Sequence, residues 1–402
     1  MSDTSRQTPH YPFSPPGALE PPQEWASLRE SCPVASIRLA SGDESVLLTR
    51  YADVRQLLSD PRFTHHLDSA DAANITANES GGVFGSGGTN MGADTHRQWR
   101  QLIGRAFTAK RVSAMQPGIE AMAEHLVDEM IKQGPPADLA GALGFPLPVW
   151  VICDLLGVPD SDRDRFSYWS DTMLSLTRFT QEEIDAAQAE FDDYLRAHVA
   201  AKRATPGDDL ISELISLVGA LDGRMTEEIM MLTAKGLLVA GHETTSNMIG
   251  KMVAMLLADR GRWEQLLADR SLIRLAVEES LRYDANPGFG IPRYISEEIQ
   301  VDDITVPAGT TVVCNLAAAN RDERQFDHAA DMDLTRSPNP HLAFGAGPYA
   351  CLGQALARTE LQTVLKVLLD RLPTLELAVP VADLARREGL IVGGLRQVPV
   401  RW

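Results

Sequence analysis

The stretch with the clearest chemical potential is HLAFGAGPYACLG, residues 341–353, which presents a single thiol, Cys351. A strongly helical segment starts around Leu352, and a helix N-terminus stabilises a thiolate through its free N–H groups and its partial positive charge. Glycines on both sides would let a flat group approach the backbone closely: Gly345, Gly347 and Gly353. A buried cysteine in an ordinary glycine-rich turn is the alternative, but the spacing FGxGxxxCxG is far more specific than one cysteine.

A second chemical feature is Ala240-Gly241-His242-Glu243-Thr244-Thr245, in the middle of a long predicted helix. Glycine inside a helix costs roughly 1 kcal/mol relative to alanine, so Gly241 needs a reason. The alternative to a functional acid–alcohol pair at Glu243 and Thr244 is a polar patch facing other helices. His242 lacks the HExxH pattern and nearby ligands of a metal site, so we expect it on the helix surface or in the core.

A third feature is the pair Glu279 and Arg282 in ESLR. Residues three apart share one face of a helix, and this spacing suits a bidentate contact between carboxylate and guanidinium. Taken alone, the pair is also typical of an ordinary surface salt bridge.

The elements that must position these residues indicate a mainly α-helical fold with small β-sheets. The pattern is mostly helical over 96–285, and one helix predicted over about 226–259 would be about 50 Å long. Short β-like segments fill 292–315, and a β-rich tail ends the chain. Residues 1–25 are expected to form an irregular arm. The Gly-, Ser-, Asn- and Asp-rich segment 64–95 is predicted to be a substrate lid, with a disordered surface loop as the alternative.

Composition limits the class of protein. The chain has 37 Lys and Arg residues and 55 Asp and Glu residues, and its net charge of -18 disfavours generic nucleic-acid binding. No linker divides the chain after residue 25, so we expect one domain, residues 1–402. The N-terminus carries no secretion signal, and proline interrupts the most apolar run, so we expect a cytoplasmic protein outside the membrane. The cysteines are too widely spaced for a disulfide scaffold or a zinc site: Cys32, Cys153, Cys314 and Cys351.

The thiol loop resembles the signature FGxGxHxCxG of the cytochrome P-450 family, the haem-thiolate monooxygenases, and the resemblance extends over nearly the whole chain. It implies haem b as cofactor, Cys351 as the proximal iron ligand, and Phe344 packed close to it. In that family the anionic sulfur ligand favours O–O cleavage. The glycines would let the loop lie flat beneath the porphyrin.

Tyr349 departs from the family pattern, which usually has His or Arg reaching a haem propionate at this position. Tyrosine donates one hydrogen bond but brings no positive charge. The resemblance gives three other propionate partners: His96 and Arg100, which share a helix face, and Arg293 in IPRYIS.

The resemblance also assigns the two helical motifs. Ala240 and Gly241 would make room for oxygen above the iron, and Glu243 and Thr244 would deliver protons. Glu279 and Arg282 match the ExxR motif, which in the family is buried and pairs with an arginine ahead of the thiol loop. Asp331 stands at the position expected for that arginine, and the possible substitutes are Arg321, Arg324 and Arg336.

The family's pocket implies a mostly apolar substrate site. The candidate lining residues, in addition to Ala240, are Phe84, Met91, Trp169, Met173, Val239, Phe289, Gly290 and Ile391. Neither a flavin nor an iron–sulfur motif is present, so electrons are expected from a separate ferredoxin and ferredoxin reductase. Candidates for a basic docking patch on this otherwise acidic monomer are Arg97, Arg105, Lys110, Arg111 and Arg358.

The resemblance therefore predicts an enzyme that activates dioxygen and oxidises a hydrophobic or aromatic small molecule in secondary metabolism. Oxidative C–C coupling of aromatic or cyclic-peptide substrates is an alternative within the same chemistry. A haem protein that binds or senses a ligand without turnover is the alternative from another class. An intact acid–alcohol pair disfavours it, because binding alone needs no proton relay.

Overall fold

The structure is a computed structural model, and it describes residues 8–63, 67, 69, 71–76, 93–163, 165–218, 225–286 and 288–402. Within these ranges the fold is mostly helical with small sheets, as the sequence predicted. The predicted lid over 64–95 lies largely outside the described residues. Its last three residues already belong to a helix, which begins at Ala93.

The helices follow one another in this order: α1 Glu24–Ser31, α2 Tyr51–Ser59, α3 Ala93–Ile103, α4 Ala109–Gln133, α5 Pro146–Leu156, α6 Arg165–Met173, α7 Gln181–Ala204, α8 Leu210–Leu217, α9 Glu227–Leu257, α10 Arg260–Ala268, α11 Ile273–Tyr283, α12 Leu316–Ala319 and α13 Gln354–Arg371. The strands are β1 Val34–Arg38, β2 Glu44–Leu48, β3 Ala137–Asp138, β4 Ile291–Ile295, β5 Ile299–Val301, β6 Ile304–Val306, β7 Thr310–Cys314, β8 Glu376–Leu377 and β9 Pro399–Arg401.

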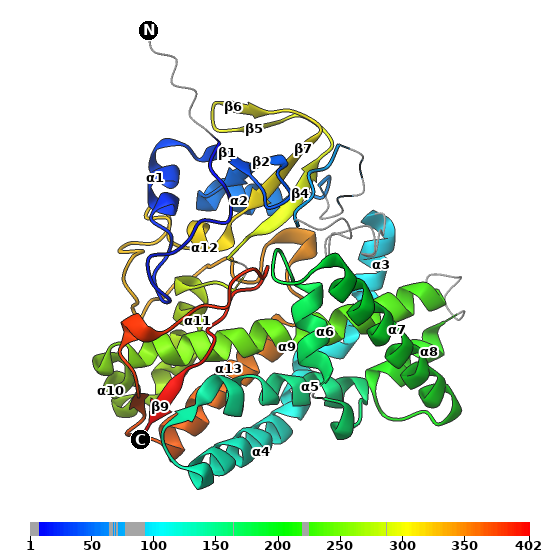
Figure 1. The fold of residues 1–402 in the computed structure, drawn as a ribbon, viewed down its shortest axis with the longest axis vertical. Coiled ribbons are helices and arrows are strands. Elements are labelled where there is room, and N and C mark those ends of the chain that lie inside the picture. The colour runs from blue at the N-terminus through cyan, green and yellow to red at the C-terminus, as the bar shows by residue number, and fades with distance from the viewer. Residues whose placement is uncertain are drawn as a thin grey trace.

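The long helix α9 crosses the helical body (Figure 1). Its 31 residues span about 46 Å at the standard rise. Thr226 caps the N-terminus by accepting a hydrogen bond from the amide of Ile229, so the predicted start at 226 is accurate. Every residue over 245–257 is buried, because α9 packs against α5, α10, α11 and α13.

The largest sheet has the strand order β1-β2-β7-β4 and lies above the helical body, next to α1, α2 and α12 (Figure 1). Strand β7 runs parallel to β2 and antiparallel to β4, and this register places Arg293 opposite Val312. The sheet therefore fixes Arg293, one of the predicted cofactor residues, at the border between sheet and helices. Smaller sheets join β3, β9 and β8, and β5 with β6.

Two hydrophobic clusters make up most of the core. One packs α4, α9, α11 and α13 together, and the other joins α5, α6, α7 and the first half of α9. No described helix is long and apolar enough to cross a membrane.

Candidate functional site

The loop that carries Cys351 is held by its backbone. The amide of Cys351 donates a 2.7 Å hydrogen bond to the carbonyl of Phe344, and Gly345 and Gly347 have φ angles of +71° and +70°. Residues with a side chain rarely adopt such φ angles. A Cβ at Gly347 would also lie 2.5 Å from the Cα of Ser59, at the end of α2. The tight approach of Gly347 is therefore to α2, whereas the sequence had predicted a flat group close to Gly345, Gly347 and Gly353.

The thiol of Cys351 is reached by solvent, but protein atoms surround it on most sides. Burial raises its pKa, and the amide of Gly353 and the guanidinium groups of Arg100 and Arg358 only partly oppose that effect. The helix α13 begins at Gln354, later than the predicted start at Leu352. Helix position alone therefore does not make this thiol acidic, and a bound metal ion would favour its thiolate form.

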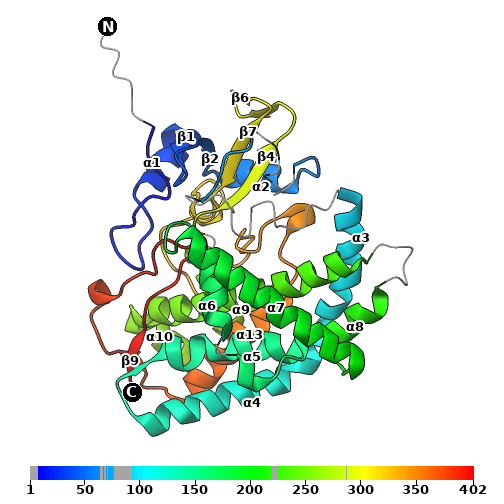
Figure 2. The same cartoon turned by 45° about the vertical axis from the view of Figure 1, so that its right-hand side comes forward.

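Polar and aromatic side chains converge beside this loop. Tyr349 stacks on His96, with ring centroids 4.2 Å apart, and the guanidinium of Arg293 lies 5.4 Å from the tyrosine ring. Arg100 donates a hydrogen bond to the carbonyl of Ala350. Figure 2 shows α3, which carries His96 and Arg100, beside the orange segment that leads into α13. We call His96, Arg100, Arg293 and Tyr349 the polar rim.

The polar rim has unused capacity to bind an anion. Arg293 is 2% exposed, and its Nε has no hydrogen-bond partner among the described residues. Burial lowers its pKa and also lowers that of Arg100, so both guanidinium groups would gain from an anionic partner. Burial raises the pKa of Tyr349, so its hydroxyl keeps its proton and remains a donor. Carboxylates are the complementary partners, and a group with a metal ion and carboxylates, such as haem, fits these residues.

Packing against α5 explains the glycine in the middle of α9. A Cβ on Gly241 would lie 2.6 Å from the Cδ1 of Ile152 in α5, so the close contact between these two helices requires glycine. Ala240 is exposed, and Thr244 donates a 3.0 Å hydrogen bond to the Ala240 carbonyl. Ala240 and Thr244 thus lie on one face of α9, while Gly241 faces α5.

Glu243 is buried in an ion-pair network. Its Oε1 accepts hydrogen bonds from Arg387 at 2.8 Å and from Asn247 at 2.9 Å. Arg387 also donates to Asp171 of α6, which pairs with Arg178 at 3.2 Å. Burial lowers the pKa of Arg387, but the carboxylates of Glu243 and Asp171 outweigh burial and raise it above its usual value. The guanidinium therefore stays charged and bridges two carboxylates.

His242 is a core histidine, one of the two options that the sequence left open. It is fully buried, and burial lowers its pKa, so the ring is neutral. The Nδ1 lies 2.6 Å from the Leu238 carbonyl and must carry the proton, so Nε2 accepts from Ser170 of α6 at 3.0 Å. This contact fastens α6 to α9.

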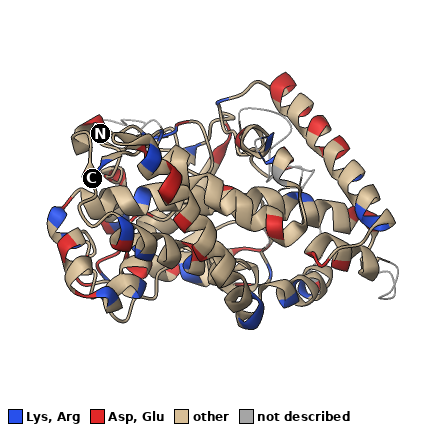
Figure 3. Ribbon diagram, turned by 90° about the horizontal axis from the view of Figure 1, so that it is seen from below, with Lys and Arg blue, Asp and Glu red and all other residues tan. Residues whose placement is uncertain are grey.

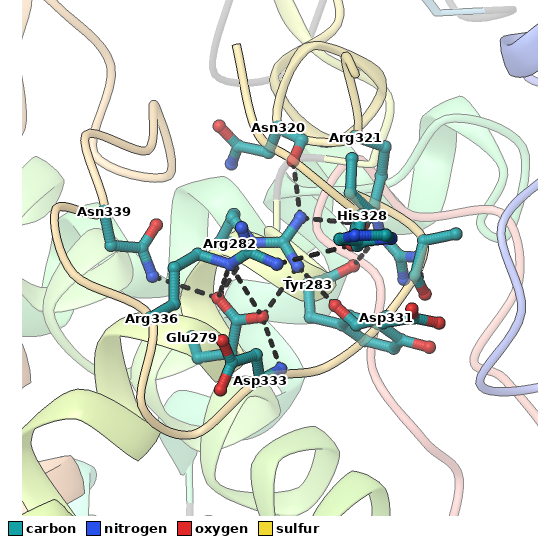
Figure 4. A network of polar contacts seen from close by, with 12 residues as sticks. Glu279, Arg282, Tyr283, Asn320, Arg321, His328, Asp331, Asp333, Arg336 and Asn339 are labelled. Carbon is teal, nitrogen blue, oxygen red and sulfur yellow. Dashed lines mark hydrogen bonds and ion pairs between the residues drawn. The ribbon is translucent and has the colours of Figure 1, made fainter.

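Glu279 and Arg282 form a buried cluster instead of a surface salt bridge (Figure 4). Both side chains are fully buried, and the guanidinium contacts the carboxylate at 2.7 and 2.8 Å. Arg336 supplies the third partner, with its Nε 3.1 and 3.3 Å from the carboxylate oxygens. Asp331, at the position expected for that arginine, contributes only its backbone carbonyl to Arg282.

The other two substitutes have different partners. Arg321 donates to the carbonyls of Tyr283 and Ala330, and Arg324 pairs with Asp322. Arg336 therefore completes the Glu279 cluster, which the sequence had left open among three arginines.

The described pocket candidates lie in the cluster that joins α6, α7 and α9. Its buried members include Trp169, Met173, Val239, Phe289 and Ile391. The Trp169 ring stacks on Phe191 of α7 at 4.8 Å, a contact typical of a core residue. Phe84 and Met91 lie outside the described residues.

Gly290 has a packing role. Its φ is +104°, and a Cβ would lie 2.6 Å from the carbonyl oxygen of Cys314. Glycine is thus required where β4 begins beside β7.

Sequence reasoning missed Asp171 and Arg387 altogether. Arg387 is 144 residues from Glu243, and no local spacing connects them. The only available signal was the expectation that a buried carboxylate needs a cationic partner, which does not say which arginine supplies it.

Comparisons with known proteins show the family to which the chain belongs. A family model described as "Cytochrome P450" matches residues 260–377. The mycinamicin IV hydroxylase/epoxidase of Micromonospora griseorubida is 39% identical over 402 residues, covering 99% of this chain and 100% of that protein. The chain belongs to the cytochrome P450 family.

Further P450 relatives match equally fully. The nocardicin C N-oxygenase of Nocardia uniformis subsp. tsuyamanensis is 39% identical over 99% of this chain and 100% of its own length. Among solved structures, the putative thioether synthase SgvP, involved in the tailoring step of griseoviridin, has a TM-score of 0.92 and 40% identity. That match covers 98% of this chain and 100% of the other. The curated relatives are bacterial P450 hydroxylases and oxygenases of secondary metabolism, and haem iron is the family's cofactor.

Proposed function

We propose that this chain is a haem-thiolate monooxygenase that carries haem b. It takes electrons from a ferredoxin and its reductase, and it inserts one atom of dioxygen into a hydrophobic or aromatic small molecule. The observation that carries the proposal is the thiol of Cys351 beside a polar rim in which the buried Nε of Arg293 has no partner among the described residues.

Cys351 would ligate the iron through its sulfur, and Arg100, His96 and Arg293 would meet the haem carboxylates. When bound, the haem supplies the activation of dioxygen, and the thiolate ligand favours O–O cleavage. Tyr349 would donate one hydrogen bond to a haem carboxylate. The stacked rings of Tyr349 and His96 and the guanidinium above them would then hold the tyrosine hydroxyl in place.

The reaction consumes two protons and two electrons per turnover, because one oxygen atom enters the substrate and the other leaves as water. Thr244 would hold a proton at its hydroxyl, on the face of α9 that it shares with Ala240. Glu243 would supply protons from the buried interior through its carboxyl group. Gly241 would allow this part of α9 to lie against α5.

The substrate would be an apolar product of secondary metabolism, bound near the side chains of Met173, Val239, Phe289 and Ile391. Two similar proteins are named for their action on mycinamicin IV and nocardicin C, both modified by oxygen. A second chemistry deserves a test, because a solved structure 40% identical to this chain is a putative thioether synthase. Oxidative bond formation, including C–C coupling, would use the same site without oxygen transfer.

Product mass separates these outcomes. The purified protein would be supplied with ferredoxin, ferredoxin reductase, NADPH and isotopically labelled dioxygen, and screened against apolar aromatic and macrocyclic compounds. We expect products that gain one labelled oxygen atom. Products that lose two hydrogens and gain no labelled oxygen would show oxidative bond formation instead, either coupling or desaturation. NADPH consumption no greater than in a haem-free control would favour a ligand-binding protein and overturn the proposal.

The ferredoxin would dock near the exposed side chains of Arg105 and Lys110. Other candidates already have acidic partners: Arg97 pairs with Asp94, Arg111 with Glu213 and Arg358 with Glu278. Lys and Arg positions, in blue, and Asp and Glu positions, in red, are also interspersed along the ribbon (Figure 3). Replacing both residues by glutamine should raise the KM for ferredoxin without changing the haem spectrum, and an unchanged KM would contradict this docking site.

A further inference from the structure

The carboxylate of Glu243 points away from Thr244 and toward Arg387, near the C-terminus of the chain. Successive residues on a helix do not face each other, so an acid and an alcohol that adjoin in sequence point in different directions. Glu243 is 1% exposed, and its Oε1 is held by Arg387 at 2.8 Å and Asn247 at 2.9 Å. A carboxylate in this position needs something to control its orientation if it is to serve the Thr244 side of α9.

Arg387 lies in a hairpin, residues 385–396, that packs against α9. The amide of Arg387 donates to the carbonyl of Gly394 at 2.8 Å, and Arg396 donates to the carbonyl of Ala385 at 2.8 Å. A Cβ on Gly394 would lie 1.9 Å from the Oδ1 of Asn247, so a side chain here would have to displace Asn247. The hairpin is thus fitted to the turn of α9 that carries Glu243.

The tip of the same hairpin is bonded to the segment that follows α6. The carbonyl of Gly389 accepts from the amides of Leu176 and Thr177 at 2.7 and 3.2 Å, and the amide of Ile391 donates to Leu174 at 2.9 Å. Leu174 directly follows α6, which carries Asp171, the second carboxylate bound by Arg387. One hairpin therefore contacts both the predicted substrate region and the acid of α9.

We propose that Arg387 is a positioning residue that holds the Glu243 carboxylate for proton delivery and ties its placement to α6 through Asp171. This inference rests on the proposed function, because it takes Glu243 as the proton source. Loss of the guanidinium would leave Glu243 buried with the neutral amide of Asn247 as its remaining donor, so no charged partner would fix the orientation of its carboxyl group. Proton delivery would then slow while electron delivery continued.

The consequence is measurable without knowing the substrate. With ferredoxin, its reductase and NADPH alone, dioxygen is reduced either to hydrogen peroxide by two electrons and two protons, or to two waters by four of each. We expect Arg387→Gln to lower the water-forming rate on the order of tenfold, a modest part of what a positioned acid contributes. Peroxide per NADPH should rise toward one, and the solvent deuterium isotope effect on NADPH oxidation should increase. Arg387→Lys, which keeps the charge, should restore part of the water-forming rate.

Arg386 provides a matched control. It lies in the same hairpin, donates to the Ala18 carbonyl at 2.7 Å and pairs with Asp284 at 3.3 Å, but it has no contact with Glu243 in the described structure. Arg386→Gln should therefore carry a similar structural cost and leave the peroxide yield unchanged. Equal peroxide yields in Arg386→Gln and Arg387→Gln, or no rescue by lysine, would overturn the inference.

Two further results complete the test. If Arg387→Gln fails to bind haem, Asp171→Asn carries the test, because it keeps the guanidinium beside Glu243 but removes its ion pair with α6; it should raise the peroxide yield, and an unchanged yield would overturn the inference. The proposed function fails separately. Its failure would appear in the unaltered protein as a missing thiolate spectrum, before any variant is compared.

Discussion

The cluster around Glu279 allows a quantitative prediction about Arg336 (Figure 4). Arg336 is 11% exposed at its side chain, and it donates to the Glu279 carboxylate and to the carbonyls of Asp327 and His328. Removing one partner of a buried ion pair typically costs 3–5 kcal/mol, roughly. Glu279 keeps its bidentate contact with Arg282 and a 3.0 Å bond from Asn339, so we expect Arg336→Met to cost about 3 kcal/mol, the lower end of that range.

The assay is thermal unfolding of the haem-loaded protein, followed by far-ultraviolet circular dichroism at one fixed scan rate. At the usual value per residue, a chain of this length has an unfolding entropy of about 0.8 kcal/mol per kelvin. The expected loss of about 3 kcal/mol in stability therefore lowers Tm by about 4 °C. The control is Arg401→Met. Its pair with Glu376 is more than half exposed on both sides, at 57% and 51%, and such pairs contribute about 0–1 kcal/mol.

A Tm for Arg336→Met within about 1 °C of the Arg401→Met control would refute the reasoning, since about 1 kcal/mol is the most that an exposed pair contributes. It would mean that Arg282 alone satisfies Glu279 and that Arg336 is incidental. A larger effect with loss of haem would show that the cluster supports the thiol loop, which begins five residues after Arg336.

The remaining predictions concern the loop, the helix and the response to acid. Gly347→Ala should bind little haem, because its φ of +70° disfavours a side chain and the added Cβ would lie 2.5 Å from the Cα of Ser59; a normal ratio of haem to protein absorbance would contradict this. Thr244→Ala should keep the haem spectrum but release more electrons as peroxide, and tight coupling would show that protons arrive by another route. Burial raises the pKa of Glu278, but hydrogen bonds from His341 and Arg358 outweigh burial and lower the pKa from 4.5 to about 2. The carboxylate therefore stabilises the fold above about pH 4.5, and this contribution is lost as the pH falls toward 2. The free energy of unfolding, measured with urea, should therefore fall less in Glu278→Gln than in the unaltered protein as the pH is lowered from about 5 to about 3.5. An identical pH dependence in the two proteins would contradict the assignment.

Local patterns predicted the elements that depend on neighbours in sequence. The long helix was placed within two residues of its ends, because Thr226 is a good N-cap and the apolar residues continue to Leu257. The pairing of Glu279 with Arg282 also follows from helical spacing. The mainly helical fold with small sheets could be predicted as well, from the resemblance and from the change from helical to β-like patterns after 285.

Contacts between distant segments could not be predicted. Arg336 reaches Glu279 only because the chain after α12 folds back over α11, and three arginines were equally available in sequence. The partner of Glu243 comes from a hairpin near the C-terminus, and its choice of Arg387 over Arg386 depends on which side chain of the hairpin faces α9. The glycines were recognised as necessary, but the neighbours that require them, Ile152 and Ser59, belong to other elements.

The central claim is that Cys351 ligates a haem iron as a thiolate, and the absorption spectrum of the purified protein, reduced with dithionite and exposed to carbon monoxide, tests it most directly. We predict the strongly red-shifted Soret band of a ferrous carbon monoxide complex with a thiolate ligand, lost in Cys351→Ala. A Soret band at the position of histidine-ligated haem, or a preparation that binds no haem at all, would contradict the account.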